Sequence, residues 1–461
     1  MASVGDRIIA RIVDLTPEWE GVGLFGAVGT KEAHDVADSV VMEKSQSPQN
    51  DGEMVRVPGV WPGDIVECAL LARSRHHGHW FGRAMRVVAH GVTREKGVCP
   101  VQAACGGCAA LTIPYEAQVA QKWARLEALF PGAGFVAAPQ PLRYRNKVKW
   151  IVGPGSDGRP TVGFYRHDSH RFLPVSDCAV LVLALARLAR QLPEVIADVP
   201  PYNEADQTGL LRAILAKCTS SGEMLVTFVV AARPDTDMVD RLSAAGTLEG
   251  VAGVTCNLHP DTGNRLTGHE EWTLVGADSV RENDHSAAYL VNATCFSQAH
   301  HSMARAAVDN IVRALHPVTE PVLDLFCGVG PIALALAADG HAVTGVELES
   351  RAIELARQAD PSLSWITADV NRIEALPTPA GDFALVVNPP RQGLSADLLS
   401  WIEAQPIRTL AYMSCNPQTL ARDAARLTAG SFILDTATGY DMFPQTPWFE
   451  TVALFFRQVN S

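Results

Sequence analysis

The chain has 461 residues, of which 47% are apolar, and a net charge of −12. This length suits about three domains of ordinary size. The negative charge argues against general affinity for polyanions, and no apolar run is long enough to span a bilayer. The N-terminus, MASVGDRIIA, lacks a signal-peptide core, so we expect a cytosolic protein with no membrane partner. We also expect a monomer. Ten cysteines in a reducing compartment favour metal binding or catalysis over disulfides.

Residues 1–95 are expected to form a small OB-like β-barrel, because short β-rich runs alternate with Gly and Pro signals. The runs are RIIARIVDL, GVGLFGAV, DIVECALLAR and WFGRAMRVV. The polar tract Glu43–Glu53 is expected to be a flexible excursion from the barrel. Barrels of this kind often bind RNA. The early GxGLF and the later PGD resemble the TRAM domain of RNA-modifying enzymes.

Basic residues are concentrated in two stretches of the chain. Arg73–Lys96 has six Lys or Arg, four His and one acid, and Lys122–Arg171 has nine Lys or Arg against three acids. Aromatic residues are interleaved with the second stretch: Tyr144, Trp150, Phe164 and Tyr165. Basic residues that alternate with aromatic ones can neutralise phosphates and stack on unpaired bases. The alternative for either stretch is a solvated strand face.

Three thiols in the spacing C-x5-C-x2-C lie in one glycine-containing loop, and a fourth cysteine follows in the polar loop PVSDCAVL. These residues are Cys99, Cys105, Cys108 and Cys178. Four thiolates suit zinc or an iron–sulfur cluster, and the three-plus-one spacing favours the cluster because zinc sites usually pair two C-x2-C knuckles. Cys218 and Cys256 lie in apolar strands, where a free thiol acts as a small hydrophobe.

The segment 96–290 is expected to be a central α+β domain that carries these cysteines and a substrate-facing surface. Its predicted strands are NKVKWIVG, LLRAILAKC, EMLVTFVV and GVTCNL. From residue 291 to 461 we expect an α/β domain. Its centre is VLDLFCGVGPIALALAADGHAVTGVE at 322–347, where an apolar run, a glycine loop, a helix and a second apolar run form a β-α-β unit.

The glycine loop of this unit indicates a nucleoside pocket. Gly328 and Gly330 allow close backbone approach, and Glu347 at the next strand end can accept hydrogen bonds from both ribose hydroxyls. A third glycine is missing, so the loop suits a nucleoside without a pyrophosphate. Asp369 and Asn388 close two further apolar runs, and polar residues at successive strand ends resemble the S-adenosylmethionine (SAM) pocket of class I (Rossmann-like) methyltransferases. An ordinary βα core with polar strand ends is the alternative.

Two side chains near the C-terminus have the pattern of catalytic groups. Cys415 lies between a strand and a helix that begins near Pro417, so the helix dipole is expected to lower the pKa of this thiol. Glu450 follows Trp448 and Phe449, and these rings are expected to raise the pKa of the carboxylate, as suits a general base. A buried strand-end cysteine and a surface glutamate are the structural alternatives.

Four motifs in this order resemble those of the bacterial RNA 5-methyluridine methyltransferase family, and the cysteine spacing resembles that of its 23S rRNA members. The motifs are LDLFCGVG, VVNPPRQGL, SCNPQTLARD and DMFPQTPWFE. The resemblance implies Cys415 as nucleophile and Glu450 as general base. It implies a SAM site made by Gln298, Phe326, Glu347, Asp369 and Asn388. It also implies a [4Fe-4S] site made by Cys99, Cys105, Cys108 and Cys178.

The implied reaction is SAM-dependent methylation of carbon 5 of a uridine in RNA, with 23S rRNA as the expected partner. The chain departs from the family pattern at three positions. Asn388 stands where many members have Asp, Pro331 replaces a small or polar residue, and His300 occupies the usual place of an asparagine. A tRNA substrate, an amino-methyltransferase that uses the Asn-Pro-Pro motif, and a non-catalytic RNA-binding assembly factor remain as alternatives.

Overall fold

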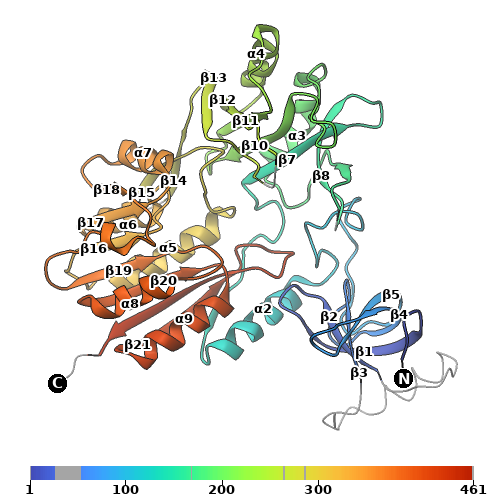
Figure 1. Cartoon of the computed structure of the whole chain (residues 1–461), viewed down its shortest axis with the longest axis horizontal. Helices are drawn as coiled ribbons and strands as arrows, with labels where there is room; N and C mark the ends of the chain where they lie inside the picture. Colours follow the sequence, from blue (N-terminus) through green and yellow to red (C-terminus); the bar gives the residue numbers. More distant parts are fainter. Residues whose placement is uncertain (1, 26–52, 168, 263–264, 285–286, 459–461) are drawn as a thin grey trace. The chain divides into compact units, whose positions relative to one another are not determined.

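A computed structural model describes residues 2–25, 53–167, 169–262, 265–284 and 287–458 (Figure 1). The chain divides into two compact units. One contains residues 1–102, 107–121 and 445–447, and the other contains residues 103–106, 122–444 and 448–461. No helix within the described ranges is long and apolar enough to cross a membrane.

The first unit contains a closed five-stranded barrel with the order β1-β2-β3-β5-β4, so the expected OB-like barrel is present. Its strands are β1 (Arg7–Leu15), β2 (Gly21–Phe25), β3 (Glu53–Val57), β4 (Ile65–Arg73) and β5 (Trp80–Ala89). Alternate residues of β2 point into the core, as a half-buried strand requires. Strand β3 is not among the predicted runs. The tract Glu43–Glu53 lies outside the described residues except for Glu53, which begins β3.

The PGD turn before β4 is organised by the buried carboxylate of Asp64. Its Oδ2 accepts a hydrogen bond from Trp61 N at 2.8 Å, and its Oδ1 accepts one from Gly91 N at 2.8 Å. The guanidinium of Arg94 forms an ion pair with the same carboxylate. A buried carboxylate is stable only when its oxygens are partnered in this way. Asp64 therefore ties the start of β4 to the segment that leaves β5.

The second unit contains a seven-stranded sheet with the order β13-β12-β11-β10-β7-β8-β9. These elements are β7 (Lys147–Pro154), β8 (Pro160–Tyr165), β9 (Phe172–Pro174), β10 (Leu211–Cys218), β11 (Met224–Val230), β12 (Val251–Leu258) and β13 (Glu270–Gly276), with α3 (Leu183–Val195) and α4 (Thr236–Ser243). Helix α3 buries Leu185, Leu188 and Leu192 against the sheet and exposes Arg187 and Arg190, as its amphipathic pattern indicates. The predicted α+β layout of this region is present.

An eight-stranded sheet forms the C-terminal part, with the order β18-β17-β16-β19-β20-β22-β21-β6. Its later strands are β16 (Val322–Leu325), β17 (Val343–Glu347), β18 (Ser364–Thr367), β19 (Phe383–Val387), β20 (Ile407–Ser414), β21 (Phe432–Tyr440) and β22 (Glu450–Arg457). The helices are α5 (His301–Leu315), α6 (Pro331–Ala338), α7 (Ser350–Ala359), α8 (Ala396–Ala404) and α9 (Pro417–Ala429). A hairpin of β14 (Val280–Asp284) and β15 (Ala287–Val291) precedes α5.

Helices cover both faces of this sheet, with α8 and α9 on one side and α5, α6 and α7 on the other (Figure 1). Strands β16 and β17 are parallel neighbours, and α6 connects them in the chain. The β-α-β unit predicted at 322–347 is therefore confirmed. Buried parallel strands with helices on both faces are the doubly wound α/β arrangement. The expected class I methyltransferase fold is therefore present.

The edge strand of the eight-stranded sheet comes from far earlier in the chain. Strand β6 (Gly134–Val136) pairs in parallel with β21. The end of helix α2 (Tyr115–Leu129) contributes Leu126 to the same hydrophobic core, as does Phe130. These residues belong to the segment that the sequence places in the central domain. The domain limits stay a prediction, although this pairing joins part of the predicted 96–290 segment to the eight-stranded sheet.

Candidate active site

Three parallel strands end side by side at the centre of the eight-stranded sheet. In the register, Leu325 of β16 lies between Val346 of β17 and Val387 of β19. The residues after these strands therefore meet at one edge, where ligands bind in sheets of this kind. Phe326, directly after β16, has a φ of 61°, a left-handed backbone that is uncommon for a residue with a side chain. Such strain is typical of a loop shaped by function.

The loop after β16 leaves room for a ligand. A Cβ placed on Gly328 would meet nothing within 4 Å, so the space beside this part of the loop is open. Glu347, at the end of β17, accepts hydrogen bonds from Gly328 N at 3.0 Å and from Leu348 N at 2.7 Å. The acidic side chain thus lies at the glycine loop, as a ribose-binding residue should.

Asp324 lies beneath this loop and is fully buried. Burial raises the pKa of its carboxyl to about 8, the N–H of Ala333 in α6 opposes the rise, and the charge of Glu347 adds to it. Among the described residues, neither carboxylate oxygen has a partner that meets hydrogen-bond geometry. A buried carboxyl with so little hydrogen bonding is costly to ionise, so positive charge on a ligand bound at the loop above it would favour its ionised form.

The remaining predicted cofactor residues lie at or near strand ends. Asn388 directly follows β19, and its N–H donates to Leu325 O at 3.3 Å, which joins it to the strand before the glycine loop. Asp369 lies two residues beyond β18 and accepts from Asn371 N at 3.0 Å. An open glycine loop, a strand-end glutamate and a buried acidic side chain beneath the loop fit SAM, which has ribose hydroxyls and two positively charged groups, an amine and a sulfonium.

Cys415 and Glu450 are close neighbours, although 35 positions separate them in the sequence. Strands β20 and β22 are antiparallel, with Ser414 opposite Thr451. Cys415 directly follows Ser414, and Glu450 directly precedes Thr451, so the pairing brings these two residues face to face. The charge of Glu450 accordingly acts on the pKa of the Cys415 thiol.

Glu450 is 3% exposed. Burial raises its pKa from an ordinary 4.5 to about 8, while a hydrogen bond from the Gln298 side chain and the charge of Arg391 oppose the rise. The sequence-based expectation of a raised pKa is thus confirmed. Within the described part of the chain, Oε2 of Glu450 and Oε1 of Gln298 have no hydrogen-bond partner. Gln298 lies three residues before α5 and contacts the proposed base directly.

The predicted lowering of the Cys415 pKa is wrong. Burial raises it, the charge of Glu450 adds to the rise, and Arg391 opposes it by charge and by a side-chain hydrogen bond. Helix α9 does begin at Pro417, but Asn416 is its N-cap and accepts from Gln418 N at 3.2 Å. A helix dipole contributes about 0.3–1 kcal/mol, less than one pKa unit, whereas burial can shift a pKa by several units.

Arg391 is a site residue that the sequence did not single out. Its guanidinium donates to the Cys415 thiol and lies near Glu450. It also stacks on Trp448, with 4.5 Å between the guanidinium carbon and the ring centre. The sequence does contain a signal that could have identified it, because Arg391 directly follows the Asn-Pro-Pro motif. One cation thus faces both proposed catalytic groups.

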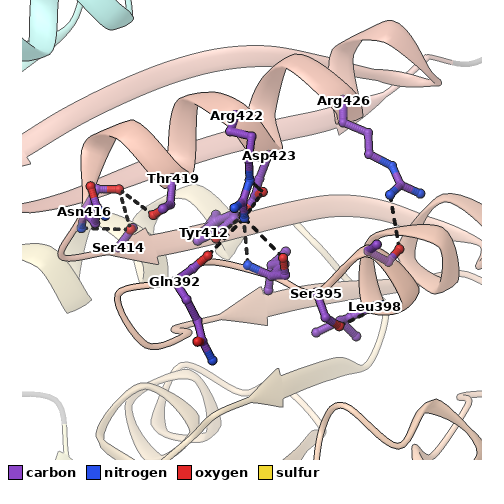
Figure 2. A network of polar contacts seen from close by, with 12 residues as sticks. Gln392, Ser395, Leu398, Tyr412, Ser414, Asn416, Thr419, Arg422, Asp423 and Arg426 are labelled. Carbon is purple, nitrogen blue, oxygen red and sulfur yellow. Dashed lines mark hydrogen bonds and ion pairs between the residues drawn. The ribbon is translucent and has the colours of Figure 1, made fainter. Parts of the chain in front are cut away.

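A polar network on α9, centred on the buried Asp423, holds the loop that carries Arg391. Figure 2 shows Arg422 and Asp423 of α9 beside Tyr412 of β20. The Asp423 carboxylate accepts from Tyr412 Oη at 2.8 Å and from Leu394 N at 2.9 Å. Arg422 donates to Gln392 O at 3.1 Å, and the Asn416 side chain donates to Arg391 O at 3.0 Å. The first turns of α9 therefore fix the loop next to Cys415.

The ten cysteines fall into two groups by exposure. Cys68, Cys218, Cys256, Cys295 and Cys327 are buried, whereas Cys99, Cys105, Cys108, Cys178 and Cys415 are partly exposed, and none of the ten forms a disulfide. Burial raises the pKa of Cys218 to about 11 and that of Cys256 to about 12, as expected for thiols that act as hydrophobes. Across the described ranges, no group of three or more His, Cys, Asp or Glu side chains lies close enough to hold a metal ion.

The aromatic residues of the second basic stretch do not form one stacking surface. Trp150 is fully buried and Tyr144 is 4% exposed, where it stacks on His300 and donates to Pro444 O at 3.0 Å. These two rings therefore cannot hold unpaired bases. Phe164 packs against the core of the seven-stranded sheet, and of the four aromatic residues named for this stretch only Tyr165 presents a large part of its ring to solvent, with an exposed fraction of 36%.

Comparisons with known proteins agree with this geometry. A methyltransferase-domain family model matches residues 322–395, and a tRNA (uracil-5-)-methyltransferase model matches residues 378–458. Uncharacterised RNA methyltransferases of Gloeobacter violaceus and Parasynechococcus marenigrum are 33% and 31% identical, over 88% and 89% of this chain and 92% of each relative. The crystal structure of Pyrococcus abyssi tRNA (uracil-54, C5)-methyltransferase with S-adenosyl-L-homocysteine covers 97% of this chain and 100% of its own, with a TM-score of 0.72 and 21% identity.

Fold and strand-end site together define a class I SAM-dependent methyltransferase. The chain belongs to the RNA uracil-5 methyltransferase family and is a SAM-dependent RNA methyltransferase. The resemblance noted from the four sequence motifs is thereby confirmed at the level of the family.

Proposed function

We propose that this protein methylates carbon 5 of a uridine in RNA through a covalent adduct of Cys415. The observation that carries the proposal is the pairing of Cys415 with Glu450 across β20 and β22, with Arg391 facing both. A thiol and a buried carboxylate are the two groups that carbon-5 methylation needs. Methylation of an exocyclic amine would require neither, so the amino-methyltransferase alternative leaves this pair without a role.

Cys415 acts first in the proposed reaction. Its thiolate adds to carbon 6 of uracil, because carbon 5 alone is too weak a nucleophile, and the ring becomes an enolate whose carbon 5 is electron-rich. SAM, when bound, supplies the electrophilic methyl group that carbon 5 takes. Gln298, Phe326, Glu347, Asp369 and Asn388 would hold SAM. Arg391 stabilises the thiolate before the addition and after its release.

Glu450 completes the reaction. After the methyl group is in place, carbon 5 still carries its original hydrogen, and the carboxylate removes it as a proton. The electron pair of that C–H bond re-forms the double bond between carbons 5 and 6, and the sulfur of Cys415 leaves as thiolate. A base with a pKa near 8 is suited to this step around neutral pH.

The direct test is nucleoside analysis of RNA incubated with the protein and methyl-labelled SAM. We expect the label in 5-methyluridine. Label in a methylated adenine or guanine would refute the proposal, and no transfer by folded protein would favour the non-catalytic assembly factor.

We further propose 23S rRNA as the substrate and a [4Fe-4S] cluster on Cys99, Cys105, Cys108 and Cys178. The cysteine spacing, which resembles that of the family's 23S rRNA members, supports both, and the partial exposure of these four thiols supports the cluster. The described residues hold no preformed metal group, but metal sites commonly assemble only when the metal binds. Iron and sulfide analysis of anaerobically purified protein tests the cluster, and protein that holds neither element would refute it. Cys68→Ser is a control, because Cys68 is buried in the barrel.

A tRNA substrate is the second candidate. The Pyrococcus abyssi tRNA enzyme matches 97% of this chain, so the domain layout alone does not separate the two classes of RNA. Incubation of the protein with unmodified 23S rRNA and with unmodified tRNA, each with labelled SAM, distinguishes them. We expect the label in one uridine of the rRNA, and label in tRNA alone would transfer the assignment to the second candidate.

A further inference from the structure

A cavity of about 970 Å³ opens on the seven-stranded sheet, apart from the strand ends that carry Cys415 and Glu450. It is lined by residues of β7, β8, β9 and β10 and of the loops beside them. Tyr165, Phe172, Tyr202, Glu204, Arg212 and His259 are the lining residues that matter here. None of them has a role in the methyl-transfer chemistry.

Aromatic rings form much of the cavity wall. The ring of Phe172 packs directly on the backbone of β7 at Gly153. A Cβ added to Gly153 would lie only 2.6 Å from this ring. Tyr165 is 36% exposed and has the ring of His170 at 5.3 Å, nearly perpendicular to its own. These rings present flat apolar surface to whatever enters. Stacking on such surface holds unpaired bases regardless of their identity.

Some polar atoms of the side chains that line this cavity lack partners. Arg212 is 8% exposed, and its guanidinium carbon lies 3.9 Å from the ring centre of Tyr202. It pairs with Glu204 at 3.2 Å, but Nε and Nη2 have no hydrogen-bond partner among the residues described. His259 is 2% exposed, and its Nδ1 likewise has none in that part of the chain. Buried donors and acceptors without partners indicate a polar ligand.

We propose that this cavity binds an unstacked nucleobase of the RNA substrate at a position other than the methylated uridine. The chemistry of the lining selects this occupant. A purely apolar ligand would leave Nε and Nη2 of Arg212 and Nδ1 of His259 without partners, and a lone phosphate would meet the carboxylate of Glu204. A base matches both features, with a flat π-face for Tyr165 and polar edges for Arg212, His259 and Glu204. Arg166 and Arg171, exposed beside Tyr165 and Phe172, suit the adjoining phosphates.

This inference deepens the proposed function and rests on RNA as the substrate. The test measures binding of a 5′-fluorescein-labelled, mixed-sequence single-stranded RNA 12-mer to the full chain by fluorescence anisotropy. Tyr165→Ala should weaken binding about tenfold, which equals about 1.4 kcal/mol and lies within the range for one base–aromatic stack. Tyr165→Phe keeps the ring and should bind within about twofold of the unchanged protein.

Phe456→Ala is the matched control, since Phe456 is 39% exposed but lies on β22, away from the cavity. The affinity of Tyr165→Ala for S-adenosyl-L-homocysteine should not change. Photocrosslinking of a 4-thiouridine-substituted 12-mer should label a peptide that contains Tyr165 or Tyr202. Binding of Tyr165→Ala within twofold of the unchanged protein, or an equal loss in Phe456→Ala, would overturn the proposal.

Failure here and failure of the proposed function are distinguishable. If the unchanged protein forms 5-methyluridine and Tyr165→Ala binds RNA normally, only the cavity proposal falls. If Tyr165→Ala loses RNA binding but the unchanged protein forms no 5-methyluridine, the cavity proposal stands and the reaction is different.

Discussion

Replacing Glu450 with Gln should stabilise the protein while it blocks release of the methylated RNA from Cys415, and so abolishes turnover. The pKa of this carboxyl is about 8 in the folded chain and 4.5 when exposed. Below pH 4.5 both states bind the proton, so the group has no effect on stability. As the pH rises from 4.5 to 8, the unfolded state ionises while the folded state stays neutral, and stability is lost. At pH 7 the loss is about 3 kcal/mol, since each pKa unit equals about 1.4 kcal/mol.

Glu450→Gln removes this penalty because the amide cannot ionise and can still accept from Gln298. Thermal unfolding followed by circular dichroism should give a melting temperature about 5 °C higher than that of the unchanged protein at pH 7. The difference should vanish near pH 4.5. Glu354→Gln, at a carboxylate whose side chain is 53% exposed, should behave like the unchanged protein at both pH values. A lower melting temperature for Glu450→Gln at pH 7 would refute the burial argument.

Four further outcomes follow from the geometry of the catalytic pair and of the cofactor loop. Arg391→Ala should raise the thiol pKa and slow alkylation by iodoacetamide at pH 8 severalfold, and an unchanged rate would show that the guanidinium does not act on the sulfur. Gly393→Ala should cost about 1–3 kcal/mol of stability and slow alkylation similarly, because its Cβ would lie 2.6 Å from the Asp423 carboxylate. Gly381→Ala is the control, with a similar φ of 81° but no atom within 4 Å, and an equal alkylation effect there would contradict the steric explanation. Single-turnover release of the methylated RNA from Cys415 should speed up as the pH increases towards 8, because Glu450 must be ionised to accept the proton from carbon 5; a release rate that falls over this range would exclude it as the base. Glu347→Gln should weaken S-adenosyl-L-homocysteine binding about tenfold by calorimetry, and unchanged affinity would remove Glu347 from the cofactor site.

The β-α-β unit at 322–347 and the helix at Pro417 could be predicted from sequence because their signals are local. Apolar periodicity, a glycine loop and a proline at the first helical position each act within a few residues. The sequence order also placed Glu347 and Asn388 at strand ends. Parallel strands bring such ends together whatever the details of packing.

Other features depend on contacts between distant segments, which local patterns do not reveal. The pairing of β6 with β21 joins residues about 300 positions apart, and no property of the short run Gly134–Val136 indicates it. The burial of Trp150 depends on which face of β7 is covered by α3. The thiol pKa of Cys415 was mispredicted because the effect of α9 is local, whereas burial and the charge of Glu450 arise from the fold.

Covalent trapping tests the central claim most directly. In RNA that contains 5-fluorouridine, fluorine replaces the hydrogen that Glu450 would remove, so the sulfur cannot be released after methylation. We predict a stable protein–RNA adduct, visible by denaturing electrophoresis, with mass spectrometry locating the link at Cys415. Its formation should require SAM and should be lost in Cys415→Ala. Efficient methylation of unsubstituted RNA with no adduct on the fluorinated RNA, or an adduct at another residue, would contradict the account.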